Sequence, residues 1–198
     1  TKTIERCAFR GSNLEEIIIP EGVIKLGYGA FKECKKMSSI VIPSSVIDIS
    51  TEPYDLFYGC DSLVNITINS LNPVYDSRDN CNAIIETATD TLLIGCKNTV
   101  IPDTTKAIGV YSFNGCTYLT NIAIPNSVTS LGGYAFSECN NLEYNEFDNG
   151  YYLGNDSNPY LVLVKAKTNS ITSCIINENT RFILNNAFTD CQSLRNIT

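Results

Sequence analysis

The sequence predicts a β-rich solenoid built from stacked coils of about 22–23 residues, and two observations support this prediction. A phenylalanine recurs three residues before a cysteine, a leucine or methionine follows after three more, and an Ile-x-Ile-Pro segment closes the unit. The strand-ending positions are spaced 23, 26, 33, 23, 23 and 29 residues apart. A repeated unit of this length is typical of proteins whose coils bury their apolar faces against one another. We therefore expect residues 1–198 to form one solenoid domain.

Each coil should contribute two short parallel strands joined by corners. In the first coil the first strand lies in Leu14–Pro20, and Val23 and Leu26 mark the second. Proline suits the end of the first strand because it cannot donate a hydrogen bond to the next coil. The corner segment, such as Ala30–Cys34, is too short for a free-standing helix, and we expect a single helical or 3₁₀ turn there.

The phenylalanine and cysteine positions predict two buried columns. Parallel side chains in neighbouring coils lie ~4.8 Å apart, whereas a disulfide requires Cβ atoms ~3.8 Å apart. The cysteine column should therefore consist of small packed thiols, not of disulfides or metal ligands. The two sets are Phe31, Phe57, Phe113, Phe136 and Phe188, and Cys34, Cys60, Cys116, Cys139 and Cys191.

The first strands predict an exposed face, because side chains alternate between the two sides of a strand. The residue before each strand-ending site is always large, so it should point inward. The residues two and four positions before that site should point outward, and we expect them to form one parallel sheet face about seven strands high. The candidate binding surface on this face comprises Glu16, Ser39, Asn65, Asn98, Asn121, Tyr144, Glu146 and Ser173.

Two insertions, residues 70–98 and 149–172, should form β-hairpins. In the first, Cys81–Glu86 and Thr91–Cys96 flank a polar turn. Antiparallel pairing then places Ile85 opposite Leu92, Ala83 opposite Ile94 and Cys81 opposite Cys96. The facing cysteines leave two states open, a disulfide and a pair of free thiols. The second hairpin should turn at Gly154–Pro159, whose residues favour tight polar loops.

Composition argues against several classes of function. The chain has no histidine, so triad hydrolases that use an imidazole base and histidine-ligated zinc sites are excluded. The net charge is −7 without a basic cluster, which disfavours nucleic acid and anionic membranes as partners. The longest apolar runs are too short to span a bilayer, and we expect no cofactor or metal. An acidic cluster (Asp76, Asp79, Glu86 and Asp90) could suggest a glycosidase or calcium site, but solvated loop charges are the commoner explanation.

The repeat unit, as in Leu119–Gly132 and Ala135–Leu142, resembles the BspA-like subfamily of leucine-rich repeats. The insertion that ends at Pro102 is also similar to an insertion-bearing repeat of that group. The resemblance implies a right-handed leucine-rich-repeat solenoid on a secreted or cell-surface bacterial protein. It further implies protein ligands, since some members are adhesins for host matrix proteins such as fibronectin.

We therefore expect a non-catalytic protein-interaction or adhesion module rather than an enzyme. Two alternatives remain open. One is a β-helix-type polysaccharide-active enzyme or carbohydrate-binding module, which would need clustered acidic and basic residues on one face. The other is a structural spacer stalk. Thr1 is no natural start and Thr198 lies within a repeat, so we expect the chain to be a piece of a longer protein.

Overall fold

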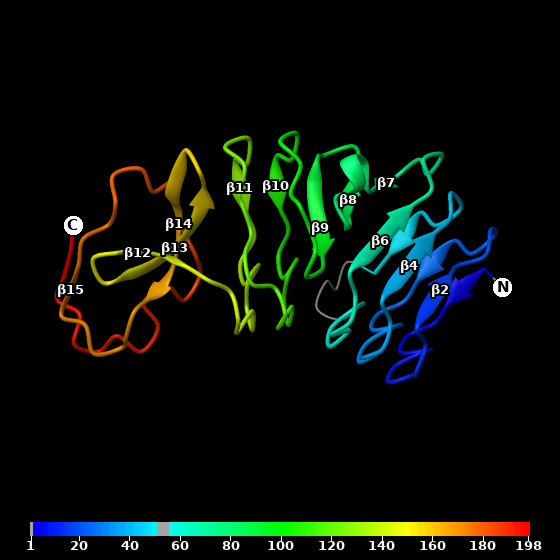
Figure 1. Cartoon of the computed structure of the whole chain (residues 1–198), viewed down its shortest axis with the longest axis horizontal. Helices are drawn as coiled ribbons and strands as arrows, with labels where there is room; N and C mark the ends of the chain where they lie inside the picture. The colour runs from blue at the N-terminus through cyan, green and yellow to red at the C-terminus, as the bar shows by residue number, and fades with distance from the viewer. Residues whose placement is uncertain (1, 51–55) are drawn as a thin grey trace. The chain divides into compact units, whose positions relative to one another are not determined.

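The computed structural model describes residues 2–50 and 56–198 and shows a β-solenoid of about eight turns with almost no helix (Figure 1). This confirms the predicted fold class. The chain divides into two compact units, which we call the N-terminal unit (residues 1–120 and 127–142) and the C-terminal unit (residues 121–126 and 143–198). Each coil of a solenoid contacts only its neighbours, so such a division does not by itself mark a domain boundary. The single domain therefore stays a prediction.

Two parallel sheets, one from each strand of the coil, begin the N-terminal unit. The first contains β2 (Glu16–Ile18), β4 (Ser39–Ile42) and β6 (Asn65–Ile68), which lie side by side in Figure 1. The second contains β1 (Thr3–Ile4), β3 (Lys25–Leu26) and β5 (Asp48–Ile49). These coils thus have the predicted two strands. In β6 the side chains alternate between exposed and buried, so isoleucines fill the interior while Asn65 and Thr67 face solvent.

The first insertion forms the predicted antiparallel hairpin. Its strands are β8 (Ala83–Glu86) and β9 (Thr91–Gly95), preceded by β7 (Tyr75–Asp76) and the 3₁₀ helix η1 (Arg78–Asn80). Strand β9 pairs in parallel with β10 (Ala107–Ile108), which pairs with β11 (Ser130–Leu131). The hairpin is therefore part of a five-stranded sheet, in the order β11-β10-β9-β8-β7, and does not project as a free loop.

The pairing within this hairpin differs in part from the prediction. Ile85 lies opposite Leu92 as expected, but a register shift follows between Ile84 and Ile85. Ala83 consequently lies opposite Gly95 and not opposite Ile94. Such a bulge places two residues of one strand against one residue of its partner. The prediction assumed one-to-one pairing outward from the turn, which cannot include a bulge.

The segment from Ala30 to Cys34 is a run of hydrogen-bonded turns, so the expected helical or 3₁₀ turn is wrong here. The amides of Ala30 and Cys34 donate to carbonyls three residues earlier in their own coil. The intervening amides of Phe31 and Glu33 donate instead to Leu56 and Tyr58 in the next coil, at 3.2 and 2.7 Å. Alternating the amide direction requires left-handed backbone, and Glu33 has a φ of 61°. A helix would direct every amide into its own coil.

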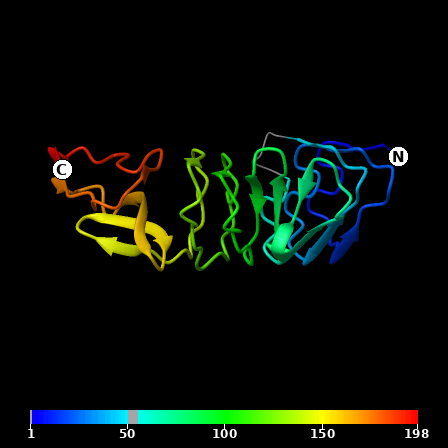
Figure 2. The ribbon, with the colours of Figure 1, turned by 90° about the horizontal axis from the view of Figure 1, so that it is seen from above.

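The second hairpin lies in the C-terminal unit and is drawn in yellow to gold in Figures 1 and 2. Strands β12 (Asn145–Phe147), β13 (Gly150–Asn155) and β14 (Asn158–Ala166) are successively antiparallel. Strand β14 then pairs in parallel with β16 (Phe182–Ile183), and β15 (Ser173–Cys174) pairs with β17 (Asn196–Ile197). The prediction of a second hairpin insertion is confirmed.

One sheet face seven strands high, the arrangement expected from the sequence, is not present in the described residues. In the N-terminal unit the regular outer sheet comprises β2, β4 and β6, and the amide of Val100 donates to Cys81 of the insertion. In the C-terminal unit β12 is antiparallel to β13. Residues of the two insertions form the backbone hydrogen bonds at these places. The segments around Val100 and β12 therefore do not extend the parallel sheet that β2, β4 and β6 begin.

The core of the N-terminal unit contains stacked phenylalanines. The ring centroids of Phe9 and Phe31 lie 5.5 Å apart, those of Phe31 and Phe57 lie 6.0 Å apart, and those of Phe113 and Phe136 lie 5.3 Å apart. The coil that contains the first insertion has no phenylalanine in the position that would stack on Phe113. There Gly95 faces the ring of Phe113, which occupies the space that a Cβ would need. In the C-terminal unit Phe188 is only half-buried.

Candidate protein-binding surface

The outward side of the first parallel sheet carries two rows of side chains, exposed on the two outer strands and half-buried on the central strand β4. We call this surface the outer sheet face. Its polar row places Ser39 opposite both Glu16 and Asn65, and its second row places Val41 opposite both Ile18 and Thr67. Ile18 lies on the edge strand β2 and is 75% exposed. The face consists of Glu16, Ile18, Ser39, Val41, Asn65 and Thr67.

The two rows give this face the chemistry of a protein-binding surface. Because neighbouring strands repeat at ~4.8 Å, Ile18, Val41 and the methyl group of Thr67 form an aliphatic strip beside hydrogen-bonding groups. The hydroxyl of Thr67 donates to the side-chain oxygen of Asn65 at 3.0 Å, which leaves the Asn65 amide nitrogen available to a ligand. An apolar centre with a polar rim is the usual anatomy of a protein interface.

Asn98 follows the first insertion and is exposed. Its backbone carbonyl accepts a hydrogen bond from the side chain of Asn82 at 3.2 Å, so it neighbours the insertion and not β6. Val100, two residues later, is 70% exposed. Asn98 and Val100 therefore form a second exposed group on the N-terminal unit, separate from the outer sheet face.

The other four predicted surface residues lie in the C-terminal unit and have different environments. Glu146 forms a 2.8 Å ion pair with Lys167. Tyr144 packs against Tyr151 with ring centroids 5.4 Å apart, and the Lys165 ammonium lies 4.9 Å from the Tyr144 ring centre. Ser173 lies in β15, opposite Asn196. Asn121 lines a hollow of about 270 Å³.

Sequence reasoning did not select several residues that the structure places at these surfaces. Ile18, Val41 and Thr67 belong to the outward row that alternation identifies, so the signal for them was present. Asp156, which also lines the hollow beside Asn121, has no such signal. It lies at a hairpin tip, and the sequence does not reveal which coil that tip folds against.

The repeated cysteines donate hydrogen bonds to the preceding coil. The thiols of Cys34 and Cys60 each donate to a phenylalanine carbonyl at 3.0 Å, those of Phe9 and Phe31 respectively. Burial raises the pKa of both Cys60 and Cys139 to about 12. Protonated thiols are poor nucleophiles, so these side chains stabilise the stack and do not provide a reactive centre. Cys116 and Cys191 make longer contacts of 3.8 Å with the carbonyls of Gly95 and Thr168.

Cys81 and Cys96 are both buried free thiols in this structure. The Cys96 sulfur contacts the carbonyl of Asn82 at 3.3 Å, and the Cys81 sulfur lies 3.9 Å from the carbonyl of Ala83. Burial raises the pKa of Cys81 to about 11. Each thiol therefore has its own backbone acceptor.

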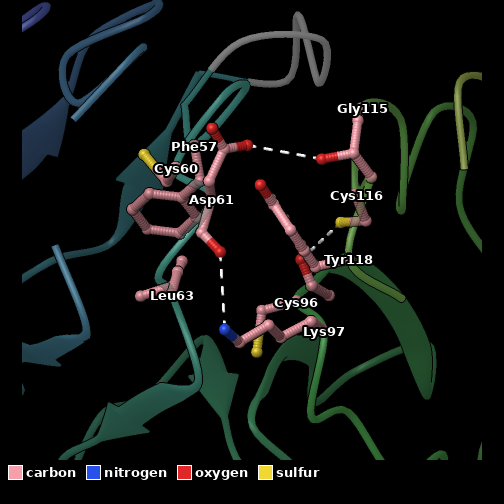
Figure 3. A pocket seen from close by; sticks show the side chains of 11 residues that line it. Phe57, Cys60, Asp61, Leu63, Cys96, Lys97, Gly115, Cys116 and Tyr118 are labelled. Atoms are coloured by element: carbon pink, nitrogen blue, oxygen red, sulfur yellow. Dashed lines mark hydrogen bonds between the residues drawn. The ribbon is translucent and has the colours of Figure 1, made fainter. Parts of the chain in front are cut away.

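A small pocket lies where the insertion repeat lacks a Phe–Cys corner (Figure 3). Its volume is about 20 Å³, which is enough for one water molecule but not for a substrate. Thr117 approaches the Asp61 carboxylate at 3.4 Å, and the Lys97 ammonium lies 3.5 Å from the Asp61 carbonyl. Burial keeps the pKa of the lining Cys116 thiol well above its ordinary value. The pocket thus holds no activated nucleophile.

Two of the four carboxylates in the acidic cluster of the first insertion, Asp76 and Asp90, form ion pairs with Arg78. The guanidinium donates to Asp76 at 2.6 and 2.8 Å and to Asp90 at 2.6 Å. Burial raises the pKa of Asp76, but hydrogen bonds from Arg78 and Thr87 outweigh this effect and hold it below its ordinary value. Among the described residues, no group of three or more His, Cys, Asp or Glu could hold a metal ion. Asp76 and Asp90 are therefore structural ion-pair partners of Arg78, and Glu86 accepts a hydrogen bond from the Thr89 hydroxyl at 2.6 Å.

None of the helices in residues 2–50 and 56–198 is long and apolar enough to cross a membrane.

Comparisons with known proteins agree with this architecture. A model described as the BspA type leucine rich repeat region matches six copies over residues 1–87, 93–157 and 166–198. No curated protein matches the chain. Similar solved structures include a leucine-rich repeat protein from Eubacterium ventriosum, with a TM-score of 0.58 and 21% identity over 98% of this chain and 57% of that one.

Two further structures are similar at the same level. The pneumococcal vaccine antigen PcpA has a TM-score of 0.58 and 19% identity over 99% of this chain and 53% of that one. A leucine rich cell surface protein from Faecalibacterium prausnitzii has a TM-score of 0.53 and 24% identity, covering 98% and 56% of the two chains. The chain thus spans little more than half the length of these proteins. At these identities the likeness concerns the fold alone.

Proposed function

Because the chain belongs to the BspA type leucine-rich repeat family, we propose that it is a non-catalytic protein-binding module of a secreted or cell-surface bacterial protein. The observation that carries this proposal is the outer sheet face, on which Ile18 is 75% exposed beside the polar row of Glu16, Ser39 and Asn65. The ligand would be a host or matrix protein. The name of the Faecalibacterium prausnitzii structure, a cell surface protein, supports the surface location.

The chemistry of the outer sheet face favours protein binding over polysaccharide cleavage. Glycosidases use two carboxylates about 5–10 Å apart, and Glu16 is the single acidic residue among the six that define this face. The face instead combines an aliphatic strip with neutral hydrogen-bonding groups. A spacer stalk, the remaining alternative, would not need an exposed aliphatic strip, because exposed apolar area often marks an interaction site.

The proposal can be tested by surface plasmon resonance against soluble host matrix proteins, fibronectin included. Ile18→Asp places a charge on the most exposed apolar side chain of the outer sheet face and should weaken binding about tenfold, because a few large apolar anchors dominate interface energies. Val110→Asp is the matched control, since Val110 is 47% exposed in the same unit but outside the outer sheet face. If Ile18→Asp and Val110→Asp bind as tightly as the native chain, the ligand uses another surface. Binding to no protein in the panel would contradict the function itself.

A further inference from the structure

The hollow in the C-terminal unit has the chemistry of a cation site, and we propose that it binds an arginine side chain presented by a protein partner. This inference rests on the proposed function and specifies one feature of the partner. The hollow measures about 270 Å³ and lies between the β13–β14 hairpin and residues 121–126. The lining residues that matter for recognition are Asn121, Ala123, Asn145, Asp156 and Pro159.

The hairpin tip is fixed over residues 121–126 by Asn155. Its side-chain nitrogen donates to the carbonyl of Ile124 at 2.7 Å, and its oxygen accepts the amides of Ser157 and Asn158, both at 3.0 Å. Gly154 permits the tight pairing within the hairpin, because a Cβ at that position would collide with the carbonyl of Asn158. The walls of the hollow are therefore preformed, which lowers the entropic cost of binding a ligand.

The polar groups left for a ligand are mainly hydrogen-bond acceptors. Asn145 uses its side-chain nitrogen to donate to the carbonyl of Pro159 at 3.0 Å, so its oxygen remains available. Asp156 is exposed, and its carboxylate forms no hydrogen bond or ion pair within the described part of the chain. Asn121 adds one further amide. A guanidinium offers five N–H donors and no acceptor, which complements this set.

Charge and shape also favour arginine over other ligands. No lysine or arginine is among the described residues that line the hollow, and Arg181 beside it donates to the carbonyl of Asn126 at 3.0 Å. The Asp156 carboxylate therefore has no cationic partner among the lining residues and disfavours anions. Ala123 and Pro159 offer apolar contact for the methylene groups of an arginine side chain, a common arrangement for long cationic residues. The net charge of −7 further favours a basic partner.

The test is an NMR titration of the ¹⁵N-labelled chain with N-acetyl-L-arginine amide, following the side-chain amide signals of Asn121 and Asn145. We expect saturable shifts of both signals. N-acetyl-L-citrulline amide has nearly the same shape but no charge, and it should bind at least tenfold more weakly. Asp156→Asn should weaken arginine binding by about tenfold, whereas Asp103→Asn, at an exposed loop position of the N-terminal unit, should have no effect.

Several outcomes would overturn the proposal. One is the absence of saturable shifts with arginine, and another is equal binding of citrulline. A neutral disaccharide such as lactose that shifts the same signals when arginine does not would assign the hollow to carbohydrate. Arginine binding without any protein ligand would support this site and refute the proposed function. Protein binding that depends on Ile18, without any arginine response, would support the proposed function and refute the arginine site.

Discussion

The thiol of Cys139 donates a 3.1 Å hydrogen bond to the carbonyl oxygen of Phe113, one coil earlier in the stack. The same relationship joins Cys34 to Phe9 and Cys60 to Phe31. Each phenylalanine carbonyl involved also accepts the amide three residues later in its own turn. The Phe-x-x-Cys motif therefore links consecutive coils by a hydrogen bond as well as by ring stacking, which explains why the two residue types recur together.

Replacing Cys139 by alanine should lower the free energy of unfolding by about 1–2 kcal/mol. The change removes a buried hydrogen bond and leaves a small cavity. Urea denaturation followed by circular dichroism would measure the loss. Cys191→Ala is the matched control, because this half-buried thiol lies 3.8 Å from its acceptor and should cost less than about 0.5 kcal/mol. Equal losses in both variants would show that the hydrogen bond is unimportant.

The raised thiol pKa values predict a loss of stability in alkali. Cys139 has a pKa of about 12 in the folded chain against an ordinary value of 9.0, so the folded state retains its proton after the unfolded chain has lost it. Stability from this thiol is complete below pH 9 and falls as the pH rises towards 12. Between pH 8 and pH 10 the loss should be about 1.4 kcal/mol. Urea melts of the native chain and Cys139→Ala at both pH values isolate this contribution, and an identical pH dependence would contradict it.

Thiol counting decides between the two states of Cys81 and Cys96 that the sequence leaves open. Both sulfurs face backbone acceptors in the structure, and the bulge after Ile84 displaces the simple pairing that would align them. We expect Ellman's reagent to detect all nine cysteines in guanidinium without a reductant. Seven would indicate a disulfide, and peptide mapping after alkylation would show whether it joins these two residues.

The repeat period predicted the solenoid and the inward and outward alternation of the first strands, and the polar turn residues of the two insertions predicted both hairpins, because these features depend on local sequence. The seven-strand face was wrong because strand pairing depends on what an insertion pairs with. Cys81 lies beside Val100, so the segment that contains Asn98 pairs with the insertion. Likewise, the hollow at Asn121 requires Asp156 from a hairpin tip 35 residues later. Contacts of that kind have no periodic signal.

The corner segments show a similar limit. Ala30–Cys34 has the length and composition of a short helical turn, and only the hydrogen bonds to the next coil reveal the alternating backbone. Glu33 adopts left-handed φ there although glutamate rarely does so. Glycine stands at the same position in two other coils (Gly59 and Gly115, φ 72° in both), so the repeats together carry a signal for this conformation that Ala30–Cys34 alone does not.

Gly95 lies beside the ring of Phe113, in the coil that contains the first insertion and lacks a stacking phenylalanine. An added Cβ would meet the ring of Phe113, which is fully buried and stacked on Phe136. Gly95→Ala should therefore destabilise the chain by about 1–3 kcal/mol through overpacking. Phe113→Leu alone should also destabilise it, since it removes part of the ring stack. In the double variant the smaller leucine makes room for the new methyl group, so the combined loss should be less than the sum of the two single losses. Chemical denaturation of the four proteins gives this coupling, and strict additivity would show that Phe113 is not what restricts position 95.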